Sequence, residues 1–298
     1  MDSEKREGYG MKIGIVGAGR LGSAFGLYAT RRGAEEVGYY SRTQASTVAA
    51  ASLVGDVGRV YTDVASLIRE SDWIVLTVPD DEIPEVVQKL AEEGDVEGKL
   101  VFHMSGAASS EVLLPMKQIG AHTASLHPLQ SFADGCSGAD KLETTVFGIE
   151  GEVAAVSVLE EWLTAAKNRY FIITATQKPL YHAAAAVVSN GLTGVVDFAL
   201  HLMAAAGIEE KTALSALLPL IEGTVQNIQE KGVAEALTGP IARGDIGTIV
   251  RHTEAIAGQA PQLLENYQML GRLTLATACQ SQLRDPKRIA RLQELLSE

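Results

Sequence analysis

Three glycines near the start of the chain constrain its fold most. The segment KIGIVGAGRLGSAFG, residues 12–26, spaces them G-x-G-x-x-G directly after an apolar run, 12–16, that is typical of a buried parallel strand. Gly17 permits a tight turn, Gly19 leaves room for a pyrophosphate, and Gly22 lets the following helix pack closely on the strand. Glycines also occur in ordinary strand-to-helix turns, but the strand before them and the helix after them favour a nucleotide site. We expect this site to comprise Gly17, Ala18, Gly19, Arg20, Leu21 and Gly22.

Strands and helices alternate through the first half of the chain. Further strands are expected at residues 36–42, 59–63, 72–79, 99–106, 123–129, 145–151 and 169–174. Such alternation predicts an α/β fold, a Rossmann doubly wound parallel sheet covered on both faces. From about Gln177 the pattern is helical only. We therefore expect a nucleotide-binding Rossmann domain at 1–176 and an all-helical second domain at 177–298.

Composition limits the partners that the chain can have. Its 298 residues carry a net charge of -12, which disfavours nucleic acid and anionic membranes as partners and leaves a small-molecule substrate. Its two cysteines, Cys136 and Cys279, are far apart in sequence, so we expect packing residues in a reducing, cytoplasmic compartment. The first ten residues, MDSEKREGYG, lack the apolar core of a signal peptide and are expected to form a loose leader.

The end of the second strand indicates which nicotinamide cofactor the chain prefers. It reads YYSRT, with Ser41, Arg42 and Thr43 and no acidic residue. An acidic residue here binds the ribose 2′-hydroxyl of NAD, whereas hydroxyls and a cation suit the 2′-phosphate of NADP. Arg42 is also compatible with a solvated surface residue. The residue types favour NADP over NAD.

The ends of two later strands are expected to line the same groove. They read TVPDDEI and HMSGAAS. Ligands in such sheets bind beyond the carboxyl ends of the strands. We expect Thr77, Val78 and Pro79 to pack on the cofactor, and Ser105 and Gly106 to lie beside the nicotinamide, although Pro79 would equally serve as a strand terminator.

Five stretches together resemble a known group of proteins. They are GAGRLG, TVPDDEI, SLHPLQSFAD, KPLYHAAAAVVSN and LTGPIARGD. These stretches are similar to Rossmann-like proteins with an all-helical C-terminal domain of unknown function, which are relatives of pyrroline-5-carboxylate reductase, ketopantoate reductase and the deazaflavin-dependent NADP oxidoreductases. The resemblance covers most of the chain. It implies an NADP-binding fold and a homodimer, and it supplies no substrate.

The stretch KPLYHAAAAVVSN is where we expect chemistry. Pro179 suits the first turn of a helix, and at about 100° per residue Lys178, His182, Ser189 and Thr193 share one stripe, with Asn190 at its edge. In several members of the wider reductase superfamily a lysine and an asparagine on this helix are catalytic, which implies these roles for Lys178 and Asn190. His182 is then a candidate proton donor, although a lone histidine on an apolar helix is often structural. The long apolar continuation, interrupted by polar residues, predicts a buried helix and disfavours a membrane span.

Two other polar stretches are weaker candidates. His127 and Gln130 follow a strand in SLHPLQSFAD and are expected to lie over the nicotinamide, or to cap a local turn. Arg243 in LTGPIARGD is a candidate anchor for a substrate carboxylate or an ordinary turn arginine, and Asp245 is placed to cap the next helix. The other histidines show no metal-ligand spacing, so no metal is expected.

Three functions fit this sequence. The first is an NADP(H)-dependent oxidoreductase that transfers a hydride to or from a small carbonyl or imine compound, with His182 or Lys178 supplying the proton and His127 as the next candidate. The second is a non-catalytic NADP-binding sensor. The third is a deazaflavin-linked NADP oxidoreductase. Fold alone does not choose among them.

Overall fold

The computed structural model describes residues 10–297, so the expected leader lies almost entirely outside the described residues. The chain forms two compact units, the first ending at Ser189 and the second beginning at Asn190. This division falls later in the chain than Thr176, where the change of sequence pattern lies. Helix α8, Lys178–Ala186, belongs to the first unit because its side chains pack against the sheet there.

The first unit contains a mostly parallel sheet with the strand order β3-β2-β1-β4-β5-β6-β7-β8. Each pair of neighbours is parallel except β6 and β7, which run antiparallel. The strands are β1 (Lys12–Val16), β2 (Glu36–Tyr40), β3 (Gly58–Val60), β4 (Trp73–Leu76), β5 (Leu100–His103), β6 (His122–Pro128), β7 (Val146–Gly151) and β8 (Arg169–Ile172). The predicted doubly wound Rossmann architecture is confirmed.

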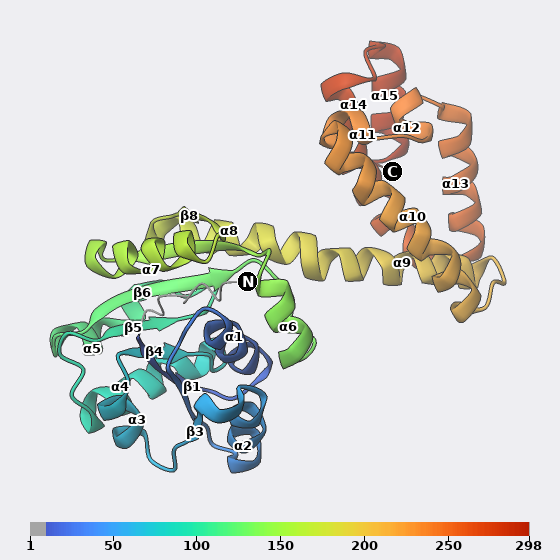
Figure 1. Cartoon of the computed structure of the whole chain (residues 1–298). Helices are drawn as coiled ribbons and strands as arrows, with labels where there is room; N and C mark the ends of the chain where they lie inside the picture. The colour runs from blue at the N-terminus through green and yellow to red at the C-terminus, as the bar shows by residue number, and fades with distance from the viewer. Residues whose placement is uncertain (1–9, 298) are drawn as a thin grey trace, which may run out of the picture. The chain divides into compact units, whose positions relative to one another are not determined.

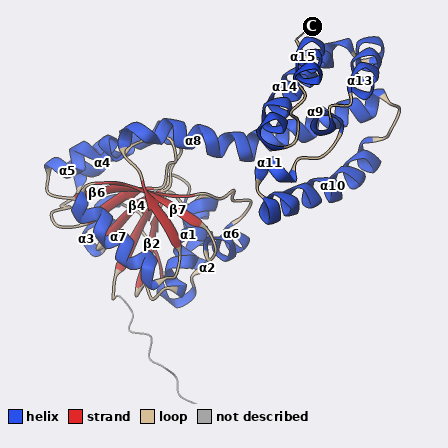
Figure 2. Cartoon of the chain, turned by 90° about the horizontal axis from the view of Figure 1, so that it is seen from above, coloured by secondary structure: helices blue, strands red, loops and turns tan. Residues whose placement is uncertain are grey.

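Helices lie against both faces of this sheet (Figure 2). They are α1 (Arg20–Arg31), α2 (Gln44–Leu53), α3 (Val64–Glu70), α4 (Ile83–Glu93), α5 (Leu114–Gln118), α6 (Gly135–Leu142) and α7 (Val153–Ala165), with short 3₁₀ turns η1 (Gly55–Val57), η2 (Asp80–Glu82), η3 (Ser110–Leu113) and η4 (Ala175–Gln177). Each face has its own core, because side chains alternate along a strand. Ile13 and Ile15 of β1 pack with α1 and α7, whereas Val16 packs with α3 and α4.

The second unit is entirely helical in its described part (Figure 1). The π-helical turn η5 (Val187–Gly191) contains the division between the units. The helices that follow are α9 (Leu192–Ala205), α10 (Glu210–Lys231), α11 (Val233–Ala236), α12 (Pro240–Arg243), α13 (Ile246–Gln259), α14 (Leu264–Ser281) and α15 (Pro286–Leu295), with a 3₁₀ turn η6 (Pro261–Leu263). Its small core joins residues of α12 to α15 and includes Ile249, Leu275 and Leu292.

The long apolar helix is not buried, which corrects the expectation from the sequence. The stretch Ala175–Ala205 has the length and composition to cross a bilayer, and its most apolar window has no buried residue. Helix α9 has no buried residue, and α10 buries only Ala213. The small core of this unit leaves these helices uncovered because it draws on other elements.

The two cysteines differ in burial. Cys279 packs beside the core of the second unit, as expected. Cys136 is exposed on α6, so the expectation that it is a packing residue is wrong. The buried face of α6 is formed by Gly138, Ala139 and Leu142, so Cys136 lies on the opposite side.

Candidate functional site

The glycine loop joins β1 to α1 in the geometry that the spacing predicts. Gly17 has φ +111°, a conformation that favours glycine, and its N–H donates to Tyr40 O at 2.9 Å. A Cβ added at Gly22 would lie 2.1 Å from Gly17 O, so this glycine allows the loop and the helix to approach each other. Thr77 completes the arrangement from the end of β4, since its hydroxyl donates to Gly17 O at 2.6 Å. The loop is therefore fixed by contacts with two neighbouring strand ends.

Gly19 differs from the other two glycines because it faces open space. A Cβ built there would meet no atom within 4 Å. Gly19 is also the N-cap of α1, and no side chain caps that helix start. Backbone N–H groups at an uncapped helix start attract phosphates. The missing side chain leaves space directly beside these groups, so this feature fits the pyrophosphate of a dinucleotide.

A pocket of about 240 Å³ opens at this loop. Its lining residues come from three strand ends and the helices that follow: Val16, Gly17, Ala18, Gly19, Tyr40, Ser41, Arg42, Ser46, Thr77, Val78, Pro79, Glu82 and Val86. The structure thus brings together eight of the residues that the sequence proposes for cofactor binding. The other six do not line this pocket. Arg20, Leu21 and Gly22 lie in the first turn of α1, Thr43 is the N-cap of α2, and Ser105 and Gly106 are buried after β5.

Glu82 is a pocket residue that the sequence does not single out. Its carboxylate pairs with the Arg42 guanidinium at 2.9 Å, and the Arg42 side chain is 81% exposed. An exposed ion pair of this kind contributes little to stability. Arg42 is therefore available to a ligand anion at small cost.

The segment that follows β5 is held by hydrogen bonds. The Ser105 hydroxyl accepts from Ala107 N at 3.1 Å and Ala108 N at 3.0 Å. His103 accepts from Ser105 N at Nδ1, at 3.2 Å, so its Nε2 carries the proton and donates to Ser109 O at 3.1 Å. Burial, with a smaller contribution from the charge of Lys178, lowers the pKa of His103 to about 4. His103 is thus a neutral histidine that fixes the loop.

Lys178 is almost fully buried at the start of α8, with 1% of its surface exposed. Its ammonium donates to Ser125 Oγ at 2.5 Å and to Ser105 O at 3.1 Å, and thereby ties α8 to β6 and to the end of β5. Burial lowers its pKa to about 8, while the charges of Glu150 and Asp80 oppose that shift. Lys178 therefore places a positive charge beneath the candidate site.

His127 and Tyr181 form a close pair above the sheet. The Tyr181 hydroxyl lies 2.6 Å from His127 Nδ1, and the rings are arranged edge to face. Gly148 on β7 makes room for the tyrosine, because a Cβ there would lie 2.9 Å from the Tyr181 hydroxyl. Phe171, the partner of Gly148 on β8, packs edge to face against the Tyr181 ring, with ring centres 5.7 Å apart. Burial, together with Lys178 and the two other nearby histidines, lowers the pKa of His127 to about 4.

His182 completes this cluster and has a buried ring nitrogen with no hydrogen-bond partner, Nδ1. A Cβ added at Gly106 would lie 2.5 Å from this nitrogen and 2.7 Å from His127 Nε2. Two histidine nitrogens therefore lie over the same glycine at the carboxyl end of β5. Buried polar atoms are normally paired, so the unpaired His182 Nδ1 is a candidate contact for a ligand group. We call His127, Lys178, Tyr181, His182 and Gly106 the polar cluster.

Asn190 is not part of the polar cluster. It is exposed in the π-helical turn η5, where it is the first residue of the second unit. A π turn takes more residues per turn than an α-helix, so the regular spacing that places Lys178, His182 and Thr193 on one stripe does not continue past Val187. Arg243 is exposed near the end of α12, and Asp245 caps α13 as expected by accepting from Thr248 N at 3.1 Å. Gln130 is exposed after β6.

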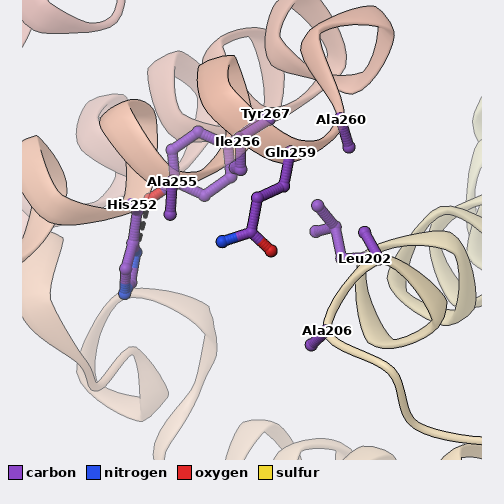
Figure 3. A pocket seen from close by; sticks show the side chains of 9 residues that line it. Leu202, Ala206, His252, Ala255, Ile256, Gln259, Ala260 and Tyr267 are labelled. Atoms are coloured by element: carbon purple, nitrogen blue, oxygen red, sulfur yellow. Dashed lines mark hydrogen bonds between the residues drawn. The ribbon is translucent and has the colours of Figure 1, made fainter.

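The second unit has a pocket of its own, of about 380 Å³ (Figure 3). It is lined by α9, α13 and α14, mostly through apolar side chains such as Leu202 and Ile256. His252 and Tyr267 on its wall bond to each other at 2.8 Å, and Gln259 projects into the space. No charged side chain lines it, so it does not suit a nucleotide phosphate. Among the described residues, no group of three or more His, Cys, Asp or Glu side chains is placed to hold a metal ion.

The sequence reasoning misses three residues at or beside the polar cluster: Tyr181, Ser125 and Glu150. Glu150 is buried on β7, opposite Ser125 on β6, and accepts from Ser110 N at 2.6 Å. For Ser125 the sequence does contain a signal that could have identified it. Ser125 precedes His127 by two residues, so in a strand both point to the same face.

Two family models match the chain. A Rossmann-like domain matches residues 2–128, and a domain of unknown function, DUF2520, matches residues 145–274. A glyoxylate reductase from Thermococcus litoralis is 40% identical over 75 residues, which is 24% of this chain and 21% of that enzyme. The similarity therefore spans about a fifth of the enzyme's length.

Solved structures resemble the whole chain. A Bacteroides fragilis protein described as an NADP oxidoreductase has a TM-score of 0.72 and 23% identity, covering 91% of this chain and 100% of that one. An imine reductase from Pseudomonas sp. has a TM-score of 0.63 and 15% identity, covering 96% and 99%. A pyrroline-5-carboxylate reductase from Coxiella burnetii has a TM-score of 0.58 and 14% identity, covering 96% and 98%. At these identities the likeness lies in the fold. The chain thus combines a Rossmann-like domain with a C-terminal DUF2520 domain.

Proposed function

We propose that the protein is an NADP(H)-dependent oxidoreductase acting on a small carbonyl or imine compound. One observation carries this proposal. The polar cluster lies at the carboxyl end of β5, and β5 pairs with β4, whose end lines the glycine-loop pocket. In parallel sheets, ligands bind at these strand ends. A dinucleotide in the pocket and a substrate beside Gly106 would therefore be neighbours.

The chain's own residues divide the work as follows. The N–H groups at the start of α1 bind the pyrophosphate beside Gly19, and Val78 and Pro79 pack on the cofactor. A bound nicotinamide supplies or accepts the hydride. His182 Nδ1, which lacks a partner, and His127 Nε2 contact the reacting oxygen or nitrogen of the substrate. Lys178 holds Ser105 in place and adds a positive charge below the site, which favours a substrate that becomes more negative.

The preference for NADP over NAD rests on the end of β2. Ser41 and Arg42 line the pocket, and Ser46 does so from the first turn of α2. Hydroxyls, a guanidinium and a helix start suit a 2′-phosphate. Glu82 is the one carboxylate of the lining, and it is paired with Arg42. A 2′-phosphate would replace Glu82 as the partner of Arg42.

The same proposal includes a homodimer, supported by the uncovered helices of the second unit. Leu192 and Val195 on α9 and Leu218 and Leu220 on α10 are exposed large apolar side chains. Exposed apolar surface of this extent marks an interaction site. The net charge of -12 opposes an anionic membrane as the partner. Closed symmetric dimers are the commonest way for a soluble chain to cover such a surface. Light scattering at micromolar concentration tests this point, and a monomer would contradict it.

Two measurements test the activity. A thermal-shift panel of NADPH, NADP, NADH and NAD shows which cofactor raises the melting temperature most, and NADPH is expected to do so. NADPH oxidation is then followed with 2-keto acids, aldehydes, cyclic imines and an oxidised deazaflavin. Turnover of a carbonyl or imine supports the proposal. Reduction of the deazaflavin alone, or tight NADPH binding without turnover of any of these compounds, would replace it by one of the two other functions.

A further inference from the structure

The two ring nitrogens of His127 have different surroundings. Nδ1 lies 2.6 Å from the Tyr181 hydroxyl. Nε2 lies on the other side of the ring, over Gly106, where a Cβ would approach it to 2.7 Å. No other protein hydrogen bond to His127 side-chain nitrogens occurs among the described residues. His127 thus connects a tyrosine hydroxyl to the place where the proposed substrate binds.

The protons of this pair can be assigned from its environment. His127 faces Lys178, Tyr181 and His182 from α8 and His103 from β5, and burial among them lowers its pKa to about 4. Its ring is therefore neutral at pH 7. Burial also raises the pKa of Tyr181, so the phenol keeps its proton. Tyr181 must then donate to Nδ1, and the single ring proton of His127 lies on Nε2.

A neutral imidazole is a weak acid unless its other nitrogen gains a proton at the same time. With a pKa of about 4, only about one molecule in 10³ would carry the imidazolium at pH 7. Direct donation by an imidazolium would therefore be slow at neutral pH. Donation of the Nε2 proton alone would leave a strongly basic imidazolate. The hydrogen bond from Tyr181 removes both difficulties.

We propose that His127 donates the proton in the reduction and that Tyr181 resupplies it through the ring. As the hydride forms the new C–H bond, the π-electron pair of the C=O or C=N bond moves to the substrate oxygen or nitrogen, and the Nε2–H bond breaks as its proton passes to that atom. The Tyr181 O–H bond breaks at the same time, and its proton forms the new Nδ1–H bond. The ring is neutral before and after, and the resting state returns when Nε2 takes a proton from water and the Nδ1 proton passes back to the tyrosinate. This step rests on the proposed function.

The energetic direction of the relay is favourable. An alkoxide or amide anion is more basic than a tyrosinate, even one whose pKa burial has raised. The geometry is also fixed in advance. The neighbouring residues Gly148 and Phe171 of β7 and β8 both contact Tyr181, and its hydroxyl lies at the histidine. His182 then serves as a substrate contact, and its role as proton donor is the competing outcome.

Rate against pH tests the relay in the holoenzyme. The measurement is kcat between pH 5 and 8 with saturating NADPH and the carbonyl or imine that the screen finds, for the wild type, Tyr181→Phe and His127→Gln. The matched control is Tyr170→Phe, which removes a hydroxyl on β8 that lies 3.4 Å from Thr164 and outside the polar cluster. The control is expected to behave as the wild type.

The expected signature is a change in the form of the pH profile. The wild-type kcat is flat between pH 5 and 7, because no group of the relay titrates there. Tyr181→Phe loses about 10²-fold at pH 7, and the loss shrinks about tenfold per unit as the pH falls, because only the imidazolium can then donate. His127→Gln loses at least as much at every pH, with NADPH affinity unchanged. A Tyr181→Phe profile parallel to the wild type, with or without a loss of rate, would overturn the relay, since a structural defect is not repaired by acid.

A second readout does not depend on activity. In protein labelled with ¹⁵N-histidine, His127→Gln identifies the His127 signals by their disappearance. These signals should show one neutral tautomer from pH 5 to 8, protonated at Nε2, and Tyr181→Phe should remove this fixed preference. A proton on Nδ1 would overturn the relay. If the wild type reduces no compound of the screen while the Nε2 tautomer is found, the proposed function fails and the hydrogen-bond arrangement does not.

Discussion

The glycine-loop pocket and the polar cluster lie at neighbouring strand ends of one sheet, yet they are built in opposite ways. The pocket is shaped by backbone. Gly17 turns the chain, and Gly19 leaves an open space beside uncapped N–H groups. The polar cluster is shaped by side chains that are distant in sequence, since His127 meets Tyr181 and Lys178 meets Ser105 across long chain separations.

This difference has a physical consequence. A site made of backbone tolerates most side-chain changes and is damaged by the addition of a single Cβ. A site made of buried polar side chains depends on each hydrogen bond, because a buried polar group without a partner costs roughly 1–3 kcal/mol. Substitutions should therefore affect cofactor affinity in the first region and turnover in the second.

Gly19→Ala tests the glycine-loop pocket and should have the largest effect on cofactor affinity. The new methyl group meets no protein atom within 4 Å, so the fold should be unaffected. It fills the space beside the N–H groups of α1, and we expect NADPH and NADH affinity to fall by more than about 10²-fold. Fluorescence titration of both cofactors and the melting temperature measure the two effects. Gly194→Ala on α9, which also meets open space, is the control. Unchanged affinity in Gly19→Ala would exclude this loop as the pyrophosphate site.

Lys178→Met tests the polar cluster, where we expect a loss of turnover and little change in cofactor affinity. Methionine fills much of the buried space but does not bond to Ser105 and Ser125. The segment beside Gly106 then loses its connection to α8, and a displacement there should lower kcat by about 10²-fold. NADPH affinity should change by less than about 3-fold, because Lys178 does not line the pocket. Steady-state kinetics and cofactor titration test this, with exposed Lys211→Met as the control. A larger effect on cofactor affinity than on kcat would show that the two regions are not separate.

The same contrast explains what the sequence predicts well. The pocket follows from a contiguous pattern, so the glycine spacing and the residues after β2 and β4 identify eight lining residues. Glu82 is not predicted, because its contact with Arg42 depends on how the short 3₁₀ turn η2 is oriented in the folded chain. The central strands β1, β4 and β5 are predictable because buried parallel strands are continuous apolar runs.

The polar cluster is less predictable because it needs the tertiary contacts of three elements. Helical spacing places Lys178 and His182 on one side of α8, but the contact between Tyr181 and His127 depends on the space left by Gly148. The π turn Val187–Gly191 changes the phase before Asn190, and no residue pattern in the sequence announces that turn. The exposure of α9 is also not visible from composition, because an apolar helix reads in the same way whether its own chain or a partner covers it.

Arg42→Ala separates the two nicotinamide cofactors within the pocket and should have a smaller effect. The guanidinium is exposed, so the loss of one charge-assisted contact should weaken NADPH binding by about 10-fold. NADH has no 2′-phosphate, and its affinity should change by less than about 2-fold. Dissociation constants for both cofactors measure this, with Arg69→Ala on α3 as the control. Equal losses for NADPH and NADH would remove Arg42 as the basis of a preference for NADP.

The smallest effect concerns stability, and it tests whether His103 supports the polar cluster as a neutral residue. Its folded pKa of about 4 lies below the ordinary value of 6.5, because the folded protein buries the ring and places it near the positive charge of Lys178. Between these two values the unfolded chain binds a proton that the folded chain does not, so stability falls as the pH drops from 6.5 to 4. The full loss from this one residue is at most about 3 kcal/mol.

His103→Gln should be less stable than the wild type at pH 7, because it loses one hydrogen bond, but its stability should depend less on pH below 6.5. Some dependence should persist, because burial lowers the pKa of His127 in the same direction. Urea unfolding at several values between pH 4.5 and 7.5 measures both effects, and exposed His201→Gln serves as the control. Parallel stability curves for the wild type and His103→Gln would show that the pKa of His103 is the same in the folded and the unfolded chain. His103 would then gain a proton in the folded protein below pH 6.5, and its hydrogen bond from Ser105 N would have to be abandoned.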